Sequence, residues 1–146
     1  LVHLRYLALV HQTHHWTARG DAFYGDHRLF GDLYDTIVSE IDAVGERAVG
    51  LGSEANVNLP LQLSQVMRLC AAGNSPQTVP QSSDLARASL IAECNFIKVL
   101  KAALASMRDC HTMTDGAENL LQQISDTHEK HIYLLKRRAS CAPLGL

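Results

Sequence analysis

The sequence lacks the features that would place the protein in a membrane or on nucleic acid. No uninterrupted apolar run approaches the roughly 20 residues that a membrane-spanning helix needs, and no signal peptide is visible. The formal net charge of −2 offers no electrostatic attraction for nucleic acid, and the one basic cluster, Lys136–Arg138, has only three residues. We therefore expect a cytoplasmic protein, and the sequence does not support DNA binding.

Cysteine is scarce as well. The chain has four cysteines, with neither the short paired spacing of a zinc ribbon nor the density of a secreted disulfide scaffold; they are Cys70, Cys94, Cys110 and Cys141. We expect reduced thiols, and a stray disulfide is the alternative.

What the sequence does have is helical periodicity along most of its 146 residues. Apolar side chains recur at three- and four-residue spacing in four segments, about residues 1–18, 21–49, 82–108 and 115–139. The connection between the second and third segments contains three of the four prolines, and its stretch LPLQLSQVMRLC predicts a short amphipathic helix. This order predicts an all-α, ferritin-like four-helix bundle, one domain of residues 1–146 with a C-terminal tail at 139–146.

Histidines fall on two of the predicted inner faces. The first helix is expected to turn five side chains inward, namely Leu4, Leu7, His11, His15 and Ala18. In the last helix, His128 and His131 continue the apolar stripe. We interpret these two as packed, hydrogen-bonded core histidines, and a further metal position is the alternative.

The second helix carries two groups of metal-ligand side chains that cannot meet within one copy of the chain. His27 lies 15 residues before Asp42, with Glu46 one turn further on. The three share one edge of the helix, but His27 and Asp42 are about 22 Å apart along its axis. If a second copy packs antiparallel about a two-fold axis near residues 34–36, His27 of one copy faces Asp42 and Glu46 of the other. Such an interface is isologous and closed, because both copies contribute the same surface.

The segments HHWTARGDAFYGDHRLF (residues 14–30) and EIDAVGERAVGLG (residues 40–52), with the short helix in the crossover, resemble the Dps family of mini-ferritins. The resemblance implies a shell of twelve subunits that binds ferrous iron at two-fold interfaces, oxidises it mainly with hydrogen peroxide, stores the ferric mineral and protects against oxidative damage. It also implies that His15 and His27 of one subunit, with Asp42 and Glu46 of its partner, form a catalytic ferroxidase site.

The residue types suit this chemistry. Imidazole and carboxylate bind ferrous iron, and carboxylate oxygen favours the ferric product, although zinc can occupy the same ligands. The simpler interpretation is that the histidines fill the core and the carboxylates form a solvated face. An ordinary ferritin is disfavoured because no Glu is followed by His three residues later. A shell or DNA-compacting protein with a vestigial metal site remains a second alternative.

One position departs from the family pattern. Gly31 stands where Dps proteins usually place a third carboxylate, so the second iron is expected to bind weakly. His11, one turn before His15, is the candidate replacement ligand. Asp32 is rotated about 100° away and is expected to be solvated.

Three further residues have two interpretations each. Trp16 is expected to pack against the corner between the first two helices, whereas the resemblance implies a role in intercepting radicals. Asp115 and Glu118 open the last helix, where the helix dipole favours acidic side chains. Their functional alternative is a ring of carboxylates that admits iron at a three-fold pore.

DNA binding in the family usually depends on a flexible basic tail, and this sequence shows none.

Overall fold

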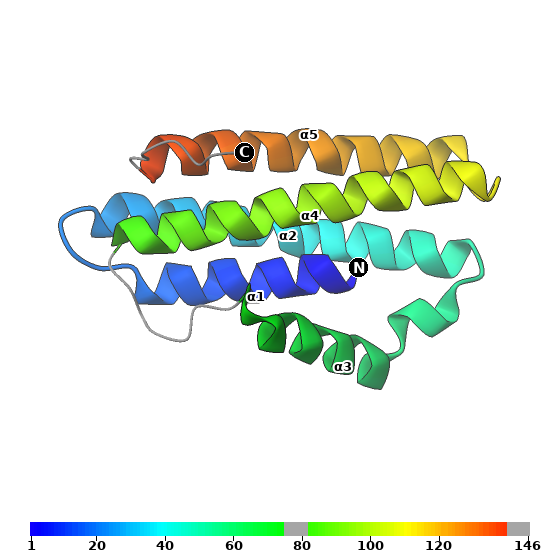
Figure 1. Ribbon diagram of the computed structural model, residues 1–146, viewed down its shortest axis with the longest axis horizontal. Coiled ribbons are helices and arrows are strands. Elements are labelled where there is room, and N and C mark those ends of the chain that lie inside the picture. Colours follow the sequence, from blue (N-terminus) through cyan, green and yellow to red (C-terminus); the bar gives the residue numbers. More distant parts are fainter. Residues whose placement is uncertain (75–81, 140–146) are drawn as a thin grey trace.

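The computed structural model describes residues 1–74 and 82–139, and every regular element within them is a helix. Four long helices lie side by side: α1 (Val2–Thr17), α2 (Phe23–Gly50), α4 (Ser82–Asp109) and α5 (Asp115–Arg138) (Figure 1). α1 packs mainly on α2, and α4 mainly on α5; the two pairs meet through contacts of α1 with α4 and of α2 with α5. The predicted four-helix bundle is confirmed, with helix bounds within about two residues of those expected.

The predicted crossover helix is also present. α3 (Leu59–Leu69) lies on the outside of the bundle, next to α1 (Figure 1). The side chain of Asn58 caps it by accepting a hydrogen bond from the backbone N–H of Leu61 at 3.0 Å, and Pro60 occupies the first turn, where its missing N–H costs nothing. A short 3₁₀ helix, η1 (Glu54–Val57), precedes α3, and a π-helical turn, η2 (Cys70–Asn74), follows it.

The core consists of two apolar clusters with a polar layer between them. The first cluster includes Leu4, Leu7, Ile37, Phe96, Leu100 and Ile124. The second includes Phe30, Leu33, Leu85, Leu90 and Leu135. Along α4, Glu93 lies between these clusters, and along α5 the same position is taken by His128 and His131. All three side chains are buried, so the bundle brings polar groups together in its interior.

Four of the five predicted inner residues of α1 are buried, and His15 is the exception. His14 is buried, whereas His15 is only half-buried and faces α2. The buried residues here are Leu4, Leu7, His11, His14 and Ala18, together with Tyr6, Ala8 and Val10. Spacings of three and four residues both suit a helical stripe, so the sequence pattern could not choose between the two adjacent histidines.

The structure bears on two expectations from the sequence, the state of the cysteines and the lack of a membrane-spanning helix. Cys70, Cys94 and Cys110 are free thiols, and Cys141 lies outside the described residues, as does the predicted tail beyond Ala139. None of the described helices combines the length and the apolar character needed to cross a membrane.

Candidate metal centre

His15 of α1 and His27 of α2 form a stacked pair where the two helices meet. Their ring centroids are 3.8 Å apart and their planes are inclined by 20°. Nδ1 of His15 donates to the backbone carbonyl of His27 at 2.6 Å, and Nδ1 of His27 donates to the carbonyl of His15 at 2.8 Å. A carbonyl only accepts, so both Nδ1 atoms carry hydrogen in the neutral rings, which leaves both Nε2 lone pairs for a metal. A hydrogen bond from the other ring nitrogen to a protein oxygen is what orients metal-binding histidines in proteins.

The local sequence explains why this pair forms. The carbonyl of His15 belongs to the last turn of α1, where carbonyls have no helical partner, and the His27 ring supplies one. On the other side, a Cβ added to Gly31 would lie 3.0 Å from Nδ1 of His15. Gly31 therefore has a structural effect besides the lack of a carboxylate at this position. Because it has no side chain, it leaves the space that the His15 ring occupies.

Asp42 and Glu46 are exposed on the same helix as His27. α2 runs unbroken through all three residues, so the separation of about 22 Å expected from the helical rise applies. Neither carboxylate forms a hydrogen bond or ion pair with another residue in the described part of the chain. A single chain thus brings His15 and His27 together but does not bring them to Asp42 and Glu46. Asp32 is exposed as expected.

His11 does not lie where a replacement ligand would have to be. It is completely buried, its Nε2 donates to Glu93 at 2.8 Å, and its Nδ1 lies 3.1 Å from the hydroxyl of Ser89. Both ring nitrogens face the bundle interior instead of Gly31. The suggestion that His11 compensates for the missing carboxylate is not supported by this placement.

The remaining candidates lie at the surface. Trp16 is 68% exposed, so the expected packing against the corner of α1 and α2 is not found within one chain. Glu118 accepts a hydrogen bond from Nε of Arg108 at 3.0 Å, and Asp115 is exposed in the first turn of α5. A role of these two carboxylates in admitting iron stays a prediction.

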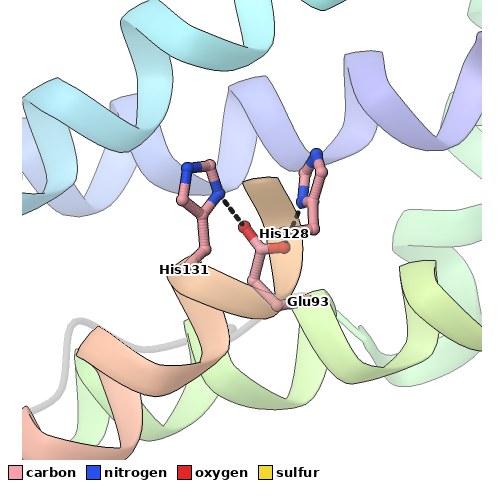
Figure 2. Close-up of side chains that lie close together, drawn as sticks. All are labelled: Glu93, His128 and His131. Atoms are coloured by element: carbon pink, nitrogen blue, oxygen red, sulfur yellow. Dashed lines mark hydrogen bonds and ion pairs between the residues drawn. The ribbon is translucent and has the colours of Figure 1, made fainter. Parts of the chain in front are cut away.

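A second cluster of metal-ligand side chains lies inside the bundle. The carboxylate of Glu93 accepts hydrogen bonds from Nδ1 of His128 and, at 3.3 Å, from Nδ1 of His131 (Figure 2). His11 donates to the same carboxylate from α1. On its other side, His128 donates through Nε2 to Glu40 of α2 at 2.8 Å. All four long helices therefore contribute to one buried polar network.

The environment sets the charge of this network. Burial alone would raise the pKa of Glu93, but hydrogen bonds from His11, His128 and His131 hold it well below its usual value. Burial alone would lower the pKa of His128, but its hydrogen bonds to Glu40 and Glu93 raise it to about 9. With a carboxylate at each nitrogen, His128 is an imidazolium at neutral pH.

Sequence reasoning identified only part of this cluster. His128 and His131 are buried and hydrogen-bonded, as interpreted, but Glu40 and Glu93 were not singled out. A signal was present at Glu93, because it shares the inner stripe of its helix with Leu90 and Phe96, three residues away on either side. A carboxylate in such a stripe is rarely buried without a partner.

Comparisons with known proteins agree with this architecture. No protein-family model matches the chain. A nutrient stress-induced DNA-binding protein from Synechococcus sp. is 36% identical over 66 residues, which are 45% of this chain and 37% of that protein. A DNA protection during starvation protein from Listeria innocua is 24% identical over 135 residues, covering 92% of this chain and 83% of that protein. Among solved structures, DpsC from Streptomyces coelicolor has a TM-score of 0.80 and 22% identity, over 99% of this chain and 81% of that one.

The contact between Gly31 and His15 can be tested with two glycines of α2. An added Cβ meets nothing within 4 Å at Gly25, so Gly25→Ala should raise the free energy of unfolding by roughly 0.5–1 kcal/mol. Gly31→Ala should bring no such gain, because the new Cβ presses on the His15 ring. Urea unfolding at matched protein concentrations measures both, and an equal gain for the two variants would contradict the proposed close packing.

The charge of His128 predicts a loss of stability at alkaline pH. The pKa of His128 is higher in the folded protein than in an unfolded chain, so its contribution is complete below about pH 6.5 and is lost as the pH rises towards 9. For metal-free protein, the free energy of unfolding should fall by roughly 3 kcal/mol across this range. Glu40→Gln removes one of the two carboxylates and should reduce this fall. A fall of the same size in Glu40→Gln would argue against the assignment.

Proposed function

We propose that this Dps-like chain, a ferritin-like four-helix bundle, binds ferrous iron between two subunits, oxidises it with hydrogen peroxide and stores the ferric product in a dodecameric shell. His15 and His27 of one subunit would bind the iron together with Asp42 and Glu46 of its two-fold partner. One observation carries the proposal. Reciprocal Nδ1 hydrogen bonds leave two imidazole Nε2 atoms available on α1 and α2, while the unbroken α2 keeps the carboxylates of the same chain out of reach.

The two halves of this site would have different chemical tasks. The neutral imidazoles bind ferrous iron, and the partner's carboxylates supply the negative charge that the ferric product prefers. Two ferrous ions each give one electron to a peroxide, which takes up two protons and leaves as two waters. Iron is therefore the substrate of the site and afterwards the stored product.

The surface next to the site is suited to a second copy of the chain. A groove between α1, α2 and α3 is lined by apolar side chains that include Leu9, Tyr34, Val38, Ile41 and Leu63. Leu9, Val38 and Leu63 are largely exposed, and Tyr34 lies where the two-fold axis is expected to cross α2. Clustered exposed apolar side chains are typical of protein interfaces. A partner seated here would cover them and would bring Asp42 and Glu46 to the opposite histidine pair.

Gly31 supports one alternative function. Without a third carboxylate, the metal site could be too weak for turnover, and the protein would then act as a shell or compact DNA. The names of the two sequence relatives refer to DNA. Peroxide consumption that depends on ferrous iron separates the two functions, because a shell with a vestigial site would not show it.

The first test concerns assembly and oxidant. Sedimentation should show a hollow dodecamer, and ferrous iron should be oxidised faster by hydrogen peroxide than by dioxygen. The twelve subunits and the preference for peroxide follow from the resemblance to the Dps family, and the need for assembly follows from a site that is complete only at a two-fold interface. A stable monomer with full ferroxidase activity would rule out the proposed function.

The second test concerns the sharing of the site between subunits. His27→Ala and Asp42→Ala should each abolish rapid iron oxidation, because each removes one half of every site. In shells reassembled from both variants, each mixed two-fold interface contains one intact site and one that lacks both residues. Iron oxidation should therefore partly recover. Shells formed from a single variant are the control, and no recovery in verified mixed shells would mean that the ligands belong to one chain.

A further inference from the structure

We propose that the bundle interior holds a second metal site, separate from the surface pair and contained within one chain, which binds one divalent first-row transition-metal ion through Glu93, His128 and His131. The three side chains come from α4 and α5, and their ligand atoms all lie within 4.8 Å of one another (Figure 2). His128 and His131 are three residues apart on one helix face, so both rings turn towards the same carboxylate. Metal sites of helix bundles are built in this way, from side chains on facing helices.

The surrounding residues already hold the ligands as they would be needed. Nε2–H of His128 donates to Glu40, which leaves Nδ1 as the atom that faces Glu93. Replacing the hydrogen on Nδ1 by a metal ion would keep the bond to Glu40 and give the carboxylate–histidine–metal arrangement that orients metal ligands in proteins. His11 donates to Glu93 from α1 and would orient that ligand. The ligands and their supporting residues are therefore both in place.

Charge also favours a dication at this position. The carboxylates of Glu40 and Glu93 lie on either side of the His128 ring. One divalent ion bound through neutral imidazoles would balance the charge of these two carboxylates. An uncompensated charge in a bundle interior is costly, so neutralisation should favour binding.

Stability alone does not account for the cluster. The apolar clusters on either side pack Leu, Ile and Phe side chains, and well-packed apolar residues commonly stabilise a core as much as a buried ion pair does. Two imidazoles and a carboxylate instead form a donor set that suits Fe²⁺, Co²⁺ or Zn²⁺ better than Mg²⁺ or Ca²⁺, which prefer oxygen. The pair on α5 is His-x-x-His, unlike the Glu-x-x-His of di-iron bundles, and it gives ligands for a single ion.

Cobalt is a suitable probe because Co²⁺ bound to nitrogen and oxygen ligands absorbs visible light. The parent for the test is chelator-treated His15→Ala/His27→Ala protein, in which the surface site is removed. Equilibrium dialysis should show about one Co²⁺ per chain, together with a visible cobalt spectrum. This readout does not depend on ferroxidase activity, so failure of the proposed function would leave it unaffected.

Three variants of this parent test the ligands. His131→Ala should weaken cobalt binding at least tenfold, and Glu40→Gln, which keeps the side chain's size, should weaken it roughly tenfold through the orientation of His128. His14→Ala is the matched control, because His14 is equally buried and contacts Ser89 but lies outside the ligand set. It should bind cobalt within about twofold of the parent. Circular dichroism of each variant verifies folding.

An anomalous-scattering map of cobalt-soaked crystals should place the ion among Glu93, His128 and His131. The proposal is overturned if the parent binds no Co²⁺, if folded His131→Ala and Glu40→Gln bind it as tightly as the parent does, or if the ion lies elsewhere.

Discussion

The carboxylate of Glu93 is fully buried and is held there by imidazoles from two other helices. Its burial would be costly without donors, and His11 from α1 with His128 and His131 from α5 supply them. The bond from His128 to Glu40 joins α2 to the same point. Each bond restricts the relative rotation and height of the helices that it joins, so the bonds around Glu93 and His128 together constrain how all four are aligned.

That alignment also sets the surface pair. With His11 directed at Glu93, His15 follows four residues later and is rotated by about 40° around α1. This small rotation turns its ring away from the interior and against α2, where it meets His27 and the space above Gly31. One helix therefore supplies an imidazole to the interior network and another to the surface, and a change in its rotation would disturb both.

The helices could be predicted from the sequence because their signals are local. Apolar spacing defined each long helix, and the prolines and the stretch after residue 58 defined the crossover. The interior network could not be predicted in full, because burial of a carboxylate depends on what faces it from another helix. Glu40 has no unusual local pattern, and only the position of His128 on α5 makes it a partner. The exposure of Trp16 likewise depends on the arrangement of α1 and α2 in space.

Under the proposed function, the surface site would take its neutral ligands from one subunit and its charged ligands from the other, which has a consequence for assembly. In one chain, Gly31 leaves the pair His15 and His27 without an anionic neighbour on the same helix face, because the His15 ring fills the space that a side chain at position 31 would need. Under the proposed function, both compensating charges, Asp42 and Glu46, come from the partner. Neither subunit alone then offers ferrous iron both nitrogen ligands and negative charge. A metal ion that binds the paired state better than the single chain must stabilise pairing by the same free energy, so iron binding and subunit association would be linked.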